Sequence, residues 1–338
     1  MEARKQQILR AVVKEFTTSA VPVGSQALAR RYFLNLSSAT IRNELADLAE
    51  LGYLVQPHTS AGRIPTDRGY RYFVDFLMDV EALPRQVKTF IDDELRGAPH
   101  DPLGQVERVA MTVAAVTGNA SVVTAPHGPR ARVKHLDLVS LEPTEALLIL
   151  LVEGNLMRQQ VLRLEKPHTQ AELSRLAVRL NRELGGKDRF DIGEPAPRPP
   201  SELERAVLRV LSDVLVQFER GSETLVVHDG VRNLLRQPEF AEHARLQQVL
   251  DVLEETRYLA ILLRELIGDS DLQIVIGSEN SSSQLRECTV VLTTYGPSDR
   301  IRGVLGAVGP TRMQYSQIVA RLRAVARTAS DRMAEAGA

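Results

Sequence analysis

Residues 37–44 have the sequence Ser-Ser-Ala-Thr-Ile-Arg-Asn-Glu, and the pattern that begins there decides the fold of the N-terminal region. Ile41, Leu45 and Leu48 are spaced as i, i+4 and i+7, which places them on one face of a helix. The spacing therefore predicts an amphipathic helix over residues 38–51, with its polar residues facing away from a core.

A second, shorter helix is predicted just before this one. Val21-Pro22-Val23-Gly24-Ser25 breaks the chain, and the polar turn Asn35-Leu36-Ser37 separates the two helices. Gly52 suits the position after the end of the longer helix. A helix, a short turn and a second helix with a polar N-terminal face form a helix-turn-helix, whose second helix enters the major groove of DNA.

The polar residues of the longer helix are of the types that contact DNA. Arginine pairs bidentately with guanine and asparagine with adenine, so Arg42 and Asn43 are candidates for base contacts. The hydroxyls of Ser37, Ser38 and Thr40 suit phosphate oxygens at the start of a helix. For this segment alone, the alternative is an ordinary amphipathic helix with a solvated polar side.

The segment that follows has the pattern of a hairpin. Residues 53–56 predict a strand, residues 57–63 a polar loop and Ile64-Pro65 a returning strand. Taken alone, this pattern also fits a plain hairpin. Directly after a recognition helix it predicts the wing of a winged helix, whose tip lies on the backbone or in the minor groove. The loop contributes four candidate DNA contacts: His58, Thr59, Ser60 and Arg63.

Length and charge suggest several domains with different partners. A chain of 338 residues is long enough for two or three domains. The first 78 residues carry ten Lys and Arg against seven Asp and Glu, a net charge of +3, which leaves −4 for the remainder. This distribution predicts specific DNA contact by one N-terminal domain and argues against a nonspecific nucleic-acid coat.

No pattern for an enzyme, a metal site or a cofactor occurs in the sequence. The seven histidines lack metal-ligand spacing, and no phosphate-binding loop or nucleophile elbow follows a strand. Cys288 is the one cysteine, so no disulfide can form within the chain. The N-terminus lacks an apolar signal segment, and the run Ala146–Val152 is far shorter than the about 20 residues of a membrane span. We expect a cytoplasmic protein that is not an enzyme.

Strand patterns occur on both sides of a helical segment. They extend over residues 121–164 and again over 272–308, and a final helix is predicted over 313–333. Between them, the helix at 203–218 has two apolar stripes, more than one face of an isolated helix needs. This order predicts an antiparallel α+β domain with a helical insertion, and the doubly apolar helix suggests a dimer contact.

Several motifs together resemble the bacterial heat-inducible transcription repressor family HrcA. They are Val23-Gly24-Ser25, the octet at 37–44, Gln56-Pro57-His58-Thr59-Ser60-Ala61-Gly62-Arg63-Ile64-Pro65-Thr66, Gly69-Tyr70-Arg71, Ile276-Gly277-Ser278-Glu279-Asn280 and Gly309-Pro310-Thr311-Arg312-Met313-Gln314-Tyr315. The resemblance covers nearly the whole chain, although no motif could be matched between about Gly185 and Gly268.

The resemblance implies an α+β multidomain fold. We expect an N-terminal winged helix-turn-helix at 1–80, a linker at 81–105, a GAF-like domain at 106–185 and 269–338, and an inserted helical dimerisation domain at 186–268. It also implies a homodimer that binds an inverted-repeat operator of the CIRCE type in double-stranded DNA before chaperone operons, with the GroE chaperonin maintaining its active state.

The sequence leaves a second function open: a transcriptional regulator that senses a small ligand through the GAF-like domain. Gly306–Pro310 leads into the C-terminal helix, whose N-terminus could hold an anion with help from Arg312. The competing interpretation of these residues is a set of turns and caps in a degenerate sensor fold.

Overall fold

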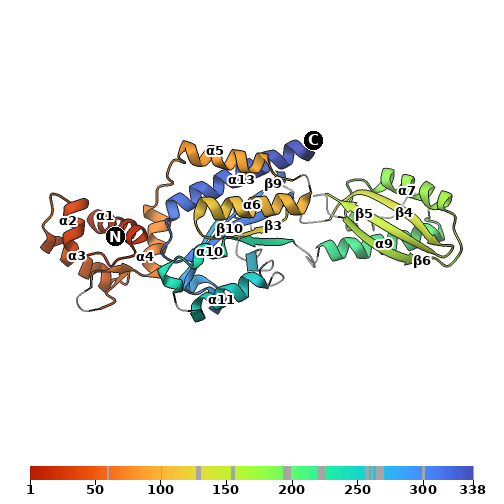
Figure 1. Cartoon of the computed structure of the whole chain (residues 1–338). Helices are drawn as coiled ribbons and strands as arrows, with labels where there is room; N and C mark the ends of the chain where they lie inside the picture. The colour runs from red at the N-terminus through yellow and green to blue at the C-terminus, as the bar shows by residue number, and fades with distance from the viewer. Residues whose placement is uncertain are drawn as a thin grey trace.

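The computed structural model shows an elongated molecule with three regions in a row (Figure 1). We call them the head (residues 1–80), the body (residues 81–126 and 225–337) and the insertion (residues 131–219). The residues described are 1–58, 61–99, 101–126, 131–153, 157–192, 199–219, 225–241, 243–255, 259, 262–263, 270–298 and 301–337.

The head is built from short helices and one hairpin. Its elements are α1 (Ala3–Ser19), α2 (Ser25–Arg31), α3 (Ser38–Glu50), β1 (Leu54–Val55), β2 (Ile64–Pro65), α4 (Asp67–Tyr72) and a π-helical turn η1 (Phe73–Leu77). Gly52 takes a left-handed conformation with φ of 76° and ends α3, as its position in the sequence predicted. Strands β1 and β2 pair antiparallel, with Leu54 opposite Pro65.

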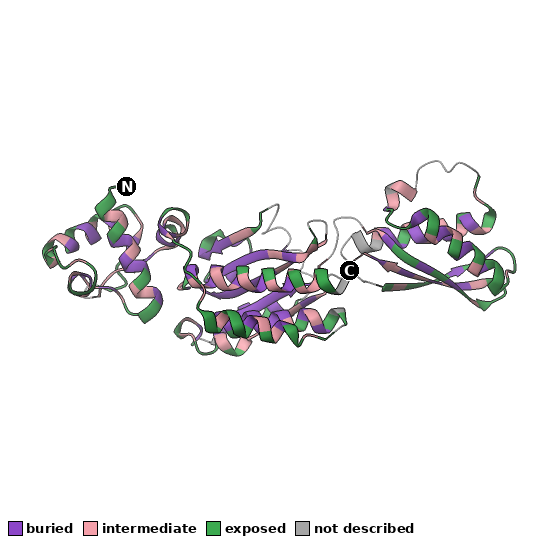
Figure 2. Ribbon diagram, turned by 90° about the horizontal axis from the view of Figure 1, so that it is seen from above, coloured by how far each residue is buried: buried purple, intermediate pink, exposed green. Residues whose placement is uncertain are grey.

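The body contains a five-stranded antiparallel sheet in the order β7-β3-β10-β9-β8. Its strands are β3 (Ala120–Thr124), β7 (Val226–Asp229), β8 (Leu272–Ile276), β9 (Cys288–Ser298) and β10 (Ile301–Pro310). Helices cover both faces and bury the sheet between them (Figures 1 and 2). One face of the sheet carries α5 (Arg85–Arg96), α6 (Pro102–Thr117) and α13 (Tyr315–Gly337). The other face carries α11 (His243–Glu254). The short helical connections of the body are α10 (Val231–Leu234), η2 (Pro238–Phe240), η3 (Gly277–Glu279) and η4 (Ser283–Leu285).

The insertion has a sheet and a core of its own. Three strands pair antiparallel in the order β4-β5-β6, and two long helices pack on one face of this sheet. The elements are β4 (Val133–Glu142), β5 (Glu145–Val152), β6 (Met157–Arg163), α7 (Gln170–Leu184), α8 (Arg189–Ile192) and α9 (Glu202–Glu219). Thr169 and Glu172 form a capping box at the start of α7.

These sheets correct the predicted domain boundaries. Residues 133–164 were expected to share a domain with 272–308, but they form the separate three-stranded sheet. The inserted unit therefore covers 131–219 and contains strands, whereas the prediction gave a helical segment at 186–268. Residues 226–229 pair with β3 and belong to the body. Helix α11 ends at Glu254, and residues 256–258, 260–261 and 264–267 lie outside the described part.

Candidate nucleic-acid interface

Helix α3 is held in the head by the apolar face that its spacing predicted. Ile41, Leu45 and Leu48 are all buried. Ser37 caps the helix: its Oγ accepts a hydrogen bond from the backbone N–H of Thr40 at 3.0 Å and lies 2.8 Å from Thr40 Oγ1. The hydroxyls of these two candidate phosphate contacts are thus already engaged with each other.

An ion-pair cluster, which sequence reasoning missed, fixes the orientation of α3. Glu44 is buried on the side of α3 that faces α1, and its carboxylate lies 3.1 Å from Lys5 Nζ and 3.6 Å from Arg4. Lys5 also lies 2.9 Å from Asp47. Hydrogen bonds to Asp47 and Glu44 raise the pKa of Lys5 above its ordinary value. Glu44, although part of the octet, therefore anchors the helix and does not face solvent.

Arg42 and Asn43 of α3 are available to a partner. Both side chains are exposed, and within the described part of the chain neither makes a hydrogen bond or an ion pair. Ser38 and Thr40 are half-buried beside them. Helices α2 and α3 lie at the end of the head that is remote from the body (Figure 1). The structure thus gathers five of the predicted contacts, Ser37, Ser38, Thr40, Arg42 and Asn43, at the start of one accessible helix.

The loop between β1 and β2 is tied back to the segment before α2. The backbone groups of Arg63 and Val23 exchange two hydrogen bonds of 2.9 Å. Gly62 is required here because a Cβ on it would lie 2.5 Å from the carbonyl group of Val23. Gln56 Nε2 donates to the carbonyl of Ala61 across the loop.

The candidate contacts of this loop differ in exposure. His58 is exposed, and Thr59 and Ser60 lie outside the described residues. Arg63 is half-buried, and its Nε is enclosed without an acceptor among the described groups. A phosphate contact from Arg63 must therefore come from its two terminal nitrogens.

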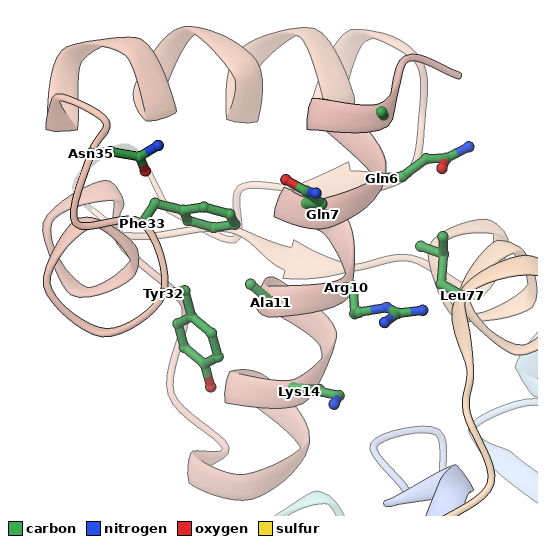
Figure 3. A pocket seen from close by; sticks show the side chains of 10 residues that line it. Gln6, Gln7, Arg10, Ala11, Lys14, Tyr32, Phe33, Asn35 and Leu77 are labelled. Carbon is green, nitrogen blue, oxygen red and sulfur yellow. The ribbon is translucent and has the colours of Figure 1, made fainter.

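A cavity of about 650 Å³ lies between α1 and the segment that joins α2 to α3 (Figure 3). Its lining includes Gln6, Gln7, Arg10, Lys14 and Tyr32. Arg10 is already paired with Asp79 at 3.1 Å. No Asp, Glu, His, Ser or Cys side chain is among the described residues that line it, so it has no nucleophile and base of the kind hydrolytic enzymes use.

The described residues form neither a metal-ligand group nor a membrane-spanning helix. No group of three or more His, Cys, Asp or Glu side chains is placed to hold a metal ion in the described ranges. Among the same residues, no helix is both long and apolar enough to cross a membrane.

Comparison with known proteins decides the family. Residues 105–319 match the family described as HrcA protein C terminal domain. A heat-inducible transcription repressor HrcA from Roseiflexus castenholzii is 39% identical, with 98% of this chain and 94% of that protein covered. The chain belongs to the HrcA family.

Membership of this chain in the HrcA family confirms the resemblance that the sequence motifs indicated. The protein of the same name from Herpetosiphon aurantiacus is 36% identical, with 99% of this chain and 96% of that protein covered. As an HrcA chain, the protein is a heat-inducible transcription repressor and not an enzyme, as predicted.

A solved structure supports the mixed α+β architecture of this HrcA chain. A hypothetical protein with a crystal structure at 2.2 Å resolution has a TM-score of 0.64 and 21% sequence identity, with 99% of both chains covered. At this identity the likeness concerns the fold alone.

Proposed function

We propose that the head is a winged helix-turn-helix that binds an inverted-repeat operator of the CIRCE type in double-stranded DNA. The exposed, unpaired Arg42 and Asn43 on an otherwise anchored helix carry this proposal. Their chemistry matches base edges in the major groove, while Ser37, Ser38 and Thr40 offer phosphate contacts. The wing residues His58, Thr59, Ser60 and Arg63 extend the contact along the backbone.

A variant at Arg42 tests base contact directly. Loss of a bidentate pair costs about 1–3 kcal/mol per half-site, so Arg42→Ala in both subunits weakens operator binding by about 2–6 kcal/mol. Binding to scrambled DNA changes much less, because phosphate contacts remain. The measurement is fluorescence anisotropy with both duplexes. Arg209→Ala, an exposed arginine of the insertion, is the matched control. An unchanged preference for the operator in Arg42→Ala would remove α3 from base recognition.

A palindromic operator requires two heads, and we propose that the insertion joins two copies of the chain. The predicted contact through α9 does not fit the structure, because Val207 and Leu211 are buried in the core of the insertion. The face of the β4-β5-β6 sheet that α7 and α9 leave uncovered is a better candidate. It bears the apolar side chains of Val139, Leu141, Leu147, Ile149, Leu151, Met157 and Val161.

Strand β5 shows why this face calls for a second copy. Residues 147–151 are Leu-Leu-Ile-Leu-Leu, a continuous apolar run of the kind found in strands buried on both faces. Only Leu148 and Leu150 are buried within the chain. Leu147 lies between Val139 and Val161 in register, and those two neighbours are 36% and 46% exposed. The same face also carries Asp137, opposite Ile149 in register, so its apolar part is the patch around Leu147. An apolar patch of this kind can pack against its own copy across a two-fold axis.

Charged substitutions separate this face from the rest of the insertion. We expect Val161→Asp to give monomers in sedimentation velocity and to reduce affinity for the inverted repeat. Val178→Asp is the matched control, because Val178 is an equally apolar residue of α7, 63% exposed and outside the sheet face. A wild-type dimer in Val161→Asp would place the interface elsewhere.

The body is proposed as the GAF-like domain that the sequence resemblance implied, with the GroE chaperonin maintaining the active state. Addition of chaperonin and ATP to heat-inactivated protein should then raise the fraction that binds the operator. The alternative, regulation by a small ligand in the body, predicts instead that one metabolite strongly stabilises the protein in a thermal-shift screen and changes DNA binding.

A further inference from the structure

Arg71 connects the head to the body through a bidentate ion pair. It lies at the end of α4, and its Nε donates to Glu279 Oε1 at 2.8 Å while a terminal nitrogen bonds Oε2 of the same carboxylate. The same terminal nitrogen donates to the backbone carbonyl of Ile274 at 2.5 Å. The guanidinium fork is thus held by strand β8 and the turn that follows it in the body, 203 to 208 residues away in sequence.

Asp67 makes a second contact to the same turn from the start of α4. Its Oδ2 accepts a hydrogen bond from the backbone N–H of Ser278 at 2.8 Å. Gly277 has φ of 52°, and a Cβ at this position would lie 2.3 Å from Asp67 Oδ2. The turn 277–279 can approach the carboxylate this closely because residue 277 is glycine.

Aromatic packing beside this clamp makes the junction continuous with the core. Tyr70 and Phe73 of the head pack on Tyr315 of the body, with ring centroids 5.6 and 6.4 Å apart, and all three are buried. Arg312 adds a hydrogen bond of 3.1 Å to the carbonyl of Thr17 at the end of α1. One hydrophobic cluster accordingly runs from the head into the body.

We propose that Asp67 and Arg71 are positioning residues, which lock the DNA-contacting head onto the turn 277–279 and thereby set the half-site spacing that the dimer accepts. This inference rests on the proposed binding of an inverted repeat. The head and the insertion lie at opposite ends of the body (Figure 1). Any freedom at the junction therefore changes the separation of the two α3 helices in a dimer joined through the insertion.

The expected consequence follows from the way two linked heads bind. When the two heads are rigidly placed, binding of one head gives the other a high effective concentration at the second half-site, but only at one half-site spacing. At a different spacing, the second head cannot bind. Heads on a loose junction tolerate several spacings but bind the best one less well, since ordering them costs free energy on binding. Loss of the clamp should therefore flatten the spacing dependence and leave the binding of each head to its half-site intact.

The experiment measures affinity of the full-length protein for inverted repeats with the natural spacer and with spacers about two base pairs shorter or longer, and for a single half-site. For Arg71→Ala we expect about a tenfold loss at the best spacing and a much smaller difference between spacers, with half-site affinity and dimer state unchanged. Arg71→Lys should behave similarly because an ammonium cannot replace the fork. Arg10→Ala, which removes the head ion pair to Asp79, is the control.

Three other results would each contradict this proposal. They are an unchanged spacing profile in Arg71→Ala, a tighter operator complex, and a half-site affinity that falls as far as the affinity for the full site. The last would mean that the clamp stabilises the fold of the head and does not position it. Failure of the proposed DNA binding has a different signature, since wild-type protein would then not prefer any inverted repeat over scrambled DNA.

Discussion

At the scale of single residues, the carboxylates of Glu44 and Glu279 have structural roles that residue type alone did not reveal. Glu44 lies three residues after Ile41 and four before Leu48, so helical spacing already placed it near the buried face. Arg42 and Asn43 fall on the opposite side by the same rule. The exposed set on α3 could therefore be predicted from local periodicity, whereas the ion partners of Glu44 on α1 could not, because they depend on how two helices pack.

Glu279 offers a test of the clamp through pH. Partial burial would raise the pKa of Glu279, but hydrogen bonds from Arg71 and the N–H of Ile276 outweigh it, so the pKa lies below its ordinary value. A carboxyl with a lowered pKa stabilises the folded state above the ordinary pKa of about 4.3, and this stabilisation is lost as pH falls through the lowered value. Glu279→Gln should accordingly reduce the Tm at about pH 7 and have little effect once the pH is well below about 4.

Calorimetry of wild type and variant across this pH range provides the measurement. Glu183→Gln on α7 is the control, because Glu183 is exposed and lies in the insertion, outside the junction with the head. A Tm difference that is the same in acid as at neutral pH would show that Glu279 contributes through shape and not through its charge.

At the scale of elements, the wing should contribute affinity without base preference. Arg63→Ala is expected to weaken binding to operator and scrambled DNA alike, and to make the salt dependence shallower by about one unit of log–log slope for each phosphate that the dimer no longer neutralises. Titrations at several salt concentrations measure this slope, and Arg63→Lys, which keeps the charge, should retain most of it. Wild-type affinity and slope in Arg63→Ala would place the loop away from DNA.

Two elements of the insertion show which structural features the sequence could not specify. The double apolar stripe of α9 suggested a partner chain, but Val207, Val214 and Leu215 are buried within the insertion itself. The continuous apolar run of β5 instead motivates the intermolecular interface that we propose. Helix and strand types followed from local patterns, whereas the assignment of β4, β5 and β6 to their own sheet depends on non-local pairing that periodicity does not specify.

At the scale of the whole molecule, the shared hydrophobic cluster predicts that head and body unfold together. Ile8, Leu28 and Leu48 of the head belong to the same cluster as Val113 and Leu322 of the body, while the insertion has a separate one. On heating, amides of α1 and α3 should lose protection from hydrogen exchange in step with those of α13, and those of the insertion independently. Mass spectrometry of exchange against temperature provides the test. Loss of protection in α3 well before α13 would contradict the coupling.

The junction through Tyr70, Phe73 and Tyr315 also limits how this protein can be divided or recombined. A fragment ending near residue 80 would present two large aromatic rings to water, and the complementary fragment would present a third with the vacated turn at 277–279. A chimera that joins this head to the body of another repressor would have to carry a matching glycine and acidic residue in the acceptor turn. Because α3 is the helix that we propose to read DNA, exchange of recognition specificity is simpler by grafting its exposed positions than by transplanting the whole head.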